Sequence, residues 1–286
     1  MKTIELELTN ICLFNCISCS RKKFQNYGFL DIYILDSIIS FIIINKYERI
    51  ILAGFGDVFL HKDFFFILLR FFIKIKGIKI FIYTKGNSLS IENIKKIKNI
   101  VNRGYDLEII FSLFSFNEKD YNILTGGLFG YKQIFKKMLL LKQNKLKIST
   151  ELLLTSYSVK DLQKYYMLCK SLSIYPAIQR LINWGGELDV DIYNRLSISE
   201  DKLLKGLVCK NKRKFKTCEF LFNDFYQINY RGDIFKCCFF EYDTSLSLGN
   251  IKYVTSIQKL KGESKLKNRL YLNRCKNCLY YSYNFD

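Results

Sequence analysis

Three cysteines lie close together near the N-terminus, at Cys12, Cys16 and Cys19, in a C-x3-C-x2-C pattern. Structural zinc sites need four ligands and usually take them as two separated pairs, so this triplet is a poor match for zinc. A 4Fe-4S cluster held by three thiolates leaves one iron without a protein ligand, and a small molecule can bind there. The sequence therefore predicts an iron-sulfur site in this loop.

A second group of cysteines lies near the C-terminus and consists of Cys218, Cys237, Cys275 and Cys278. Four thiolates ending in a C-x2-C pair could form a zinc ribbon, and ligand count alone favours zinc. Glu5 and Glu7 interrupt the N-terminal stretch where a secretory signal needs an unbroken apolar core. We therefore expect a cytoplasmic protein, in which the abundance of cysteine, ten residues in all, indicates metal ligands rather than disulfides.

The formal net charge of +19 raises the question of a nucleic-acid partner. Only ten of the 45 basic residues are arginine, the side chain best suited to bidentate phosphate contacts. The chain is instead rich in Lys, Ile, Asn, Tyr and Phe, as an AT-rich genome imposes. We therefore expect no nucleic-acid partner, and no membrane segment either, because the most apolar stretches, residues 37–44 and 64–75, are too short to span a bilayer.

Short apolar runs rich in β-branched residues alternate with longer amphipathic stretches up to about residue 190. Repeated βα units of this kind predict a parallel sheet. The expected strands are 3–9, 49–54, 78–84, 107–114, 147–155 and 174–182, and the expected helices are 33–45, 62–75, 90–102, 130–144 and 160–172. Six units predict an α/β fold with a partial (β/α)6 TIM-type barrel.

The pattern changes after Gly185 and Gly186, where a polar segment and a basic run precede short strands and cysteines. We predict a barrel domain at residues 1–205 and a small α+β domain at residues 206–286. A core this small is commonly held together by a metal centre.

The cysteine loop follows the first expected strand directly and is preceded by Glu7-Leu8-Thr9-Asn10. This arrangement resembles the defining motif of the radical S-adenosylmethionine (SAM) superfamily. The resemblance implies that the open iron binds the methionine portion of SAM and that an electron from the cluster cleaves SAM to a 5'-deoxyadenosyl radical. That radical abstracts hydrogen from the substrate, which the barrel positions away from water. Many members of the family have an aromatic residue just before the third cysteine, where this chain has Ser18. The difference bears on the packing beside the adenine of SAM and not on the binding of the cluster.

Residues 53–58 read AGFGDV and resemble the family's Gly-Gly-Glu-Pro turn, which holds the methionine amino group. The resemblance implies that Gly54 and Gly56 allow the backbone to approach SAM and that Asp57 pairs with its ammonium.

Residues 84–87, TKGN, resemble the family's Thr-Asn-Gly turn, and Ser112 stands in its fourth-strand segment, where a hydroxyl approaches the ribose. Parallel barrels place their chemistry at the carboxyl ends of the strands. The candidates for catalytic groups that face the barrel lumen are Glu7, Glu151, Arg180 and Asn183.

The C-terminal cysteines resemble the short auxiliary-cluster module called the twitch domain, which is related to the SPASM domain. Gly232 to Cys237 match its Gly-x4-Cys hairpin, and residues 248–251, LGNI, match one of its strands. The resemblance implies a second 4Fe-4S cluster with four cysteine ligands. Cys238 or Cys209 could replace a ligand, but the spacing from Gly232 favours Cys237. Cys169, in a helical pattern, is expected to be a small buried apolar residue.

These features favour an enzyme that oxidises, crosslinks or epimerises a polar substrate, with an external electron donor such as flavodoxin or ferredoxin. A peptide is the preferred substrate, and an aminosugar or aminocyclitol is the alternative within the superfamily. An alternative of another class is a zinc-stabilised basic protein that binds nucleic acid.

Overall fold

The computed structural model describes residues 1–127, 130–181, 190–198, 225–241, 243–267 and 270–271. Its sheet runs in the order β6-β5-β4-β3-β2-β1-β7-β8, and all neighbouring pairs are parallel except β7 with β8. The strands are β1 (Thr3–Leu6), β2 (Arg49–Leu52), β3 (Lys79–Thr84), β4 (Asp106–Leu113), β5 (Lys147–Leu154), β6 (Pro176–Arg180), β7 (Tyr226–Ile228) and β8 (Ile234–Phe235). The first six confirm the predicted α/β fold with βα units.

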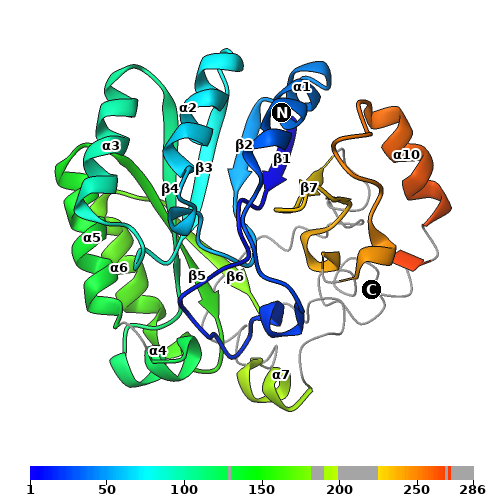
Figure 1. Cartoon of the computed structure of the whole chain (residues 1–286). Coiled ribbons are helices and arrows are strands. Elements are labelled where there is room, and N and C mark those ends of the chain that lie inside the picture. The colour runs from blue at the N-terminus through cyan, green and yellow to red at the C-terminus, as the bar shows by residue number, and fades with distance from the viewer. Residues whose placement is uncertain (128–129, 182–189, 199–224, 242, 268–269, 272–286) are drawn as a thin grey trace.

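Helices cover the outer face of this sheet (Figure 1). They are α1 (Leu35–Ile44), α2 (Phe64–Lys74), α3 (Ile91–Asn102), α5 (Tyr131–Gln143) and α6 (Leu162–Leu172), while α4 (Glu118–Thr125), α7 (Val190–Leu196) and α10 (Ile257–Leu266) lie away from this face. Single 3-10 turns are η1 (Ser20–Lys23), η2 (Ile32–Ile34), η3 (Val58–Leu60), η4 (Val159–Asp161), η6 (Cys238–Phe240) and η7 (Thr244–Leu246). The five predicted helices correspond to α1, α2, α3, α5 and α6, whereas α4, α7 and α10 were not predicted.

Alternation along the strands separates an apolar face from a more polar one. In β3, Ile80 and Ile82 are fully buried, whereas Phe81 and Tyr83 are only half-buried. The apolar face packs against the helices and forms the main core. Cys169 on α6 is also buried, as expected for a small apolar residue.

The β7–β8 hairpin adds to the sheet at β1, beside the N-terminal strand (Figure 1). Gly232 turns the hairpin with φ +85°, a conformation that favours glycine. Residues 248–251 pair with it, since Leu248 N donates to Ile234 O at 2.7 Å and Ile251 N donates to Gly232 O at 2.8 Å. The predicted domain boundary, between residues 205 and 206, falls within residues 199–224, which lie outside the described residues, and it stays a prediction.

Candidate active site

The cysteine loop begins where β1 ends, at the edge toward which the parallel strands point (Figure 1). Thr9 Oγ1 donates to Gly28 O at 2.7 Å and accepts from Ile11 N at 3.0 Å. Asn10 accepts from Gly28 N at 2.9 Å and donates to Asn26 O at 2.9 Å. The Thr-Asn pair therefore fixes the start of the loop against residues 26–28.

Helix α4 holds the middle of the same loop. Asn15 N donates to Thr125 O and Ile17 N donates to Leu124 O, each at 3.1 Å, so the free carbonyls at the end of α4 are satisfied by the loop. Gly126 ends α4 with φ +86°, and a Cβ added to it would lie 3.0 Å from Asn15 O. An unpredicted helix therefore positions the three cysteines.

Each of the three sulfur atoms accepts a hydrogen bond. Cys12 Sγ accepts from Phe14 N at 3.4 Å and Cys19 Sγ accepts from Arg21 N at 3.5 Å. Cys16 Sγ accepts from Lys85 Nζ at 2.7 Å. Cys16 is buried, and burial raises the pKa of Cys12 and Cys19, although the Lys85 charge lowers both.

The surroundings of the loop fit a group rich in acceptor atoms. Tyr121 on α4 is fully buried, and its hydroxyl has no hydrogen-bond partner among the described residues. Burial and the nearby thiols of Cys16 and Cys12 raise the pKa of Tyr121. Cys12, Cys16 and Cys19 would hold a 4Fe-4S cluster, whose sulfides are hydrogen-bond acceptors and would suit a site with an unused donor. Among the described residues, no three His, Cys, Asp or Glu side chains converge on a single metal ion.

The turn after β2 packs tightly against the cysteine loop. Glu7 is fully buried and accepts from Phe55 N at 2.7 Å. A Cβ on Gly54, which has φ +136°, would lie 2.5 Å from Glu7 Cγ, and one on Gly56 would lie 2.1 Å from Thr9 O. The chain's own packing therefore requires both glycines, and their contact with SAM is left as a prediction.

Asp57 connects this turn to the turn after β3. One of its carboxylate oxygens accepts from Phe59 N at 3.1 Å and the other accepts from Thr84 Oγ1 at 3.0 Å. Thr84 Oγ1 also accepts from Gly86 N at 2.8 Å. Burial raises the pKa of Asp57, while these hydrogen bonds and the Lys85 charge lower it. Protein donors thus already bind both oxygens that we expect to face the SAM ammonium.

Several polar side chains share the half-buried inner face of the sheet. Ser112 on β4 lies beside Glu151 on β5 in the strand register. Tyr83 on β3 is half-buried, and burial together with the carboxyl groups of Glu151, Glu5 and Glu108 raises the pKa of its phenol. Burial also raises the pKa of Glu151. The inner face therefore offers hydroxyl and carboxyl groups to a polar ligand.

Of the other predicted residues, some lie within the described part of the chain and others lie outside it. Arg180 is the last residue of β6, and its side chain is not described. Cys237 is buried and precedes η6, and Cys238 is half-buried beside it. Residues 183, 209, 218, 275 and 278, which include three of the four predicted auxiliary ligands, lie outside the described residues.

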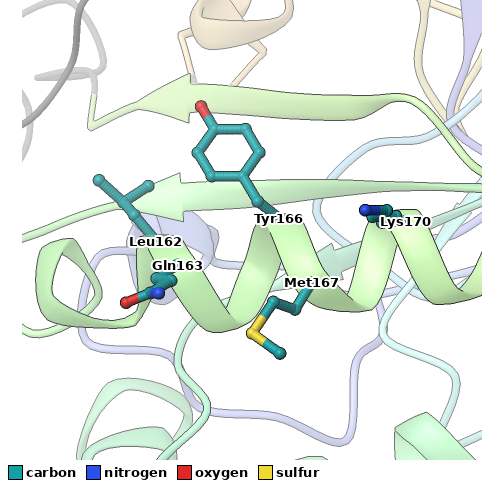
Figure 2. A pocket seen from close by; sticks show the side chains of 5 residues that line it. All are labelled: Leu162, Gln163, Tyr166, Met167 and Lys170. Atoms are coloured by element: carbon teal, nitrogen blue, oxygen red, sulfur yellow. The ribbon is translucent and has the colours of Figure 1, made fainter.

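A shallow hollow on α6 is lined by Leu162, Gln163, Tyr166, Met167 and Lys170 (Figure 2). Tyr166 and Met167 are exposed, so the hollow belongs to the outer helical surface. We therefore place the active site at the carboxyl ends of the strands and not in this hollow.

A model of the radical SAM superfamily matches residues 6–169, more than half of the chain, including the cysteine loop and both turns. The chain therefore belongs to the radical SAM superfamily and is an enzyme. Members of this superfamily carry a 4Fe-4S cluster. A search of curated protein sequences found no match. No helix of the described residues is long and apolar enough to cross a bilayer.

Solved structures of radical SAM enzymes share this fold. BtrN in complex with AdoMet and 2-DOIA is 17% identical, with a TM-score of 0.63 over 98% of this chain and 93% of BtrN. The enzyme anSMEcpe with bound AdoMet is 15% identical, with a TM-score of 0.68 over 100% of this chain and 88% of anSMEcpe. Streptococcus suis SuiB bound to precursor peptide SuiA is 12% identical, with a TM-score of 0.70 over 97% of this chain and 69% of SuiB. At these identities the likeness shows the fold, a partial TIM barrel.

Proposed function

We propose that the chain binds a 4Fe-4S cluster through Cys12, Cys16 and Cys19 and uses it with SAM to oxidise or crosslink a polar substrate. The observation that carries this proposal is the fixed position of the three thiols on one loop, between the β2 turn and α4, in a chain of this superfamily. When bound, the cluster and SAM supply a 5'-deoxyadenosyl radical that removes hydrogen from the substrate.

The protein's own residues prepare the site for this chemistry. Glu7 fixes the turn that presents Asp57, and α4 fixes the loop that presents the thiols. Asp57 remains the group for the SAM ammonium, because a buried carboxylate can accept more than one charge-assisted hydrogen bond. Ser112 would face the ribose, and Glu151, Glu7 and Arg180 are the candidates for groups that contact the substrate or orient the site.

A second 4Fe-4S cluster on Cys218, Cys237, Cys275 and Cys278 belongs to the same proposal. A substrate that has lost a hydrogen atom must lose one more electron and a proton to become an oxidised product. A cluster with four cysteine ligands has no open iron and is suited to take that electron. The buried Cys237 beside a glycine-turned hairpin supports this assignment. The starting electron would come from an external donor such as flavodoxin or ferredoxin.

We favour a peptide as the substrate. The structures of SuiB with precursor peptide SuiA and of anSMEcpe with the Cp18Cys peptide support this choice. A second candidate is an aminosugar or aminocyclitol, favoured by the match to BtrN, which covers 93% of that shorter enzyme. Short open reading frames beside the gene would supply the peptide to test, and a product lighter by two hydrogens would identify an oxidation.

Iron content tests the cluster assignments. Anaerobically reconstituted protein should hold about eight irons, and the Cys12→Ala/Cys16→Ala/Cys19→Ala variant should hold about four and cleave no SAM. Cys169→Ala is the matched control, because Cys169 is buried on α6 and is not a predicted ligand, so this variant should keep about eight irons. Nearly complete iron loss in the triple variant, or wild-type protein with about two zinc ions, would contradict the proposal.

A further inference from the structure

Lys85 points a positive charge at a predicted cluster ligand. Its Nζ lies 2.7 Å from Cys16 Sγ, and no ion pair joins it to a carboxylate among the described residues. The ammonium also lies 4.1 Å from the ring centre of Phe114 and 5.2 Å from that of Phe14. Two aromatic faces and one sulfur atom therefore surround the charge, where an ordinary surface lysine would be hydrated.

The backbone around Lys85 is fixed by contacts on both sides. Thr84 Oγ1 accepts from Gly86 N at 2.8 Å. Lys137 Nζ donates to Gly86 O at 2.6 Å and to Asn87 O at 2.8 Å. A Cβ on Gly86 would lie 2.7 Å from Phe111 Cε1, so the turn sits directly on the core. The direction of the Lys85 side chain is therefore set by the fold.

Within the described part of the chain, the other two predicted ligands accept no hydrogen bond from a charged side chain. There, Cys12 and Cys19 accept hydrogen bonds only from backbone N–H groups, at 3.4 and 3.5 Å, whereas Cys16 accepts one from the charged Lys85 ammonium at 2.7 Å. Hydrogen bonds to the sulfurs and the net charge nearby set the reduction potential of an iron-sulfur cluster. Reduction adds one electron from the external donor and breaks no bond, so a nearby positive charge stabilises the reduced state.

We infer that Lys85 is a positioning residue that acts through Cys16 and raises the reduction potential of the SAM-binding cluster. This inference rests on the proposed function, because it needs a cluster on Cys12, Cys16 and Cys19. It extends that function, because a cluster with a higher reduction potential is easier for the external donor to reduce. The Lys85 charge is held beside the Cys16 sulfur by the fold, so its effect on the reduction potential requires no conformational change.

The test is a redox titration of the reconstituted enzyme, following the cluster whose EPR signal changes when SAM is added. Lys85→Met should keep its iron and shift the midpoint potential to more negative values. Lys85→Arg retains the charge and should stay close to wild type. Lys137→Met is the matched control, because it releases the same turn without removing a charge from sulfur, and its potential should not move.

Two results would overturn the inference. One is an unchanged potential in Lys85→Met protein that holds full iron, and the other is an equal shift in the Met and Arg variants, which would indicate altered packing alone. If Lys85→Met loses its cluster, Lys85→Gln takes its place, since it removes the charge and keeps a donor. Its potential must then lie below that of Lys85→Arg. Wild-type protein without a SAM-responsive cluster would instead refute the proposed function.

Discussion

Cysteines in two regions of the molecule face opposite surroundings. Cys16 receives a hydrogen bond from the Lys85 ammonium at 2.7 Å. Cys238 lies instead beside Cys237, and their hydrogen bond, burial and the carboxyl groups of Glu5 and Glu241 raise the pKa of Cys238 well above its usual value. Cys16 in the N-terminal loop therefore has a positive charge beside its sulfur, whereas the C-terminal hairpin places the sulfur of Cys238 next to acids.

The acids of the second region are themselves buried. Glu241 accepts from Gln227 Nε2 at 2.8 Å, and burial and the facing Glu7 carboxyl raise its pKa well above the usual value. Glu7 also accepts from Phe55 N in the turn beside the cysteine loop. One side chain thus touches both regions. The comparison shows that a cysteine motif alone does not determine the electrostatic environment of its sulfurs, because residues far away in the sequence supply the charges beside them.

The largest effect should come from removing the predicted C-terminal cluster while leaving the N-terminal cysteines intact. In a folded Cys275→Ala/Cys278→Ala protein, 5'-deoxyadenosine should still form from SAM, while the oxidised or crosslinked product should be lost, because the N-terminal cysteines are intact. Chromatography of 5'-deoxyadenosine and mass spectrometry of the product measure the two halves separately.

The control for that variant is its circular dichroism spectrum, since a small domain can depend on its metal for folding. Product at the wild-type rate in a folded double variant would mean that the second site is structural. A redox-neutral reaction such as epimerisation would then explain the enzyme better.

A smaller effect is expected at Asp57, on the N-terminal side of the comparison. Asp57→Ala should weaken SAM binding by about 1.5–3 kcal/mol, the range for a hydrogen bond to a charged group, and should keep the iron. Thr84→Val is the matched control, because it removes one donor to Asp57 and leaves the carboxylate. Calorimetry with both variants measures the difference, and equal affinities for wild type and Asp57→Ala would restrict Asp57 to its role in the turn.

The sequence was sufficient for the parts of the fold that depend on local patterns. Alternating β-branched strands and amphipathic crossovers predicted β1 to β6 because both periodicities are visible along the chain. Helix α4 was missed because its eight residues carry little periodicity, although Asn117 and Gly126 offered a cap at each end. The pairing of β7 with β1 is non-local and left no local signal.

The site shows the same division. The spacing of Cys12, Cys16 and Cys19 is local and was readable, whereas the bond from Lys85 to Cys16 spans 69 residues of chain. Lys85 occupies the second position of the TKGN turn, where the resemblance expects Asn, and that departure was the available signal. Glu7 was a candidate for lumen chemistry, but no pattern could show that its carboxyl binds the Phe55 amide.

The remaining prediction concerns Glu5, on the acidic side of the comparison. Glu5 is 9% exposed, and within the described part of the chain its carboxyl group makes no hydrogen bond or ion pair. Burial and the nearby Glu7 raise the pKa of Glu5 from 4.5 to about 8. The folded protein therefore keeps this proton up to about pH 8, while the unfolded chain loses it near pH 4.5. The stability that Glu5 contributes is fully present below the lower value and is lost as the pH rises to the higher one.

Glu5→Gln stays neutral at every pH and should remove this loss. Its gain in unfolding free energy over wild type should be small near about pH 5 and should grow to at most about 5 kcal/mol near pH 8, at about 1.4 kcal/mol per pKa unit. Urea unfolding of the cluster-loaded protein under anaerobic conditions measures the gain at each pH. The control is Glu92→Gln, because Glu92 is exposed on α3 and pairs with Lys96, which lowers its pKa. A gain for Glu5→Gln that does not change with pH would mean that Glu5 is ionised in the folded state. The acids beside Cys237 and Cys238 would then carry charge, and the contrast with the lysine beside Cys16 would be sharper still.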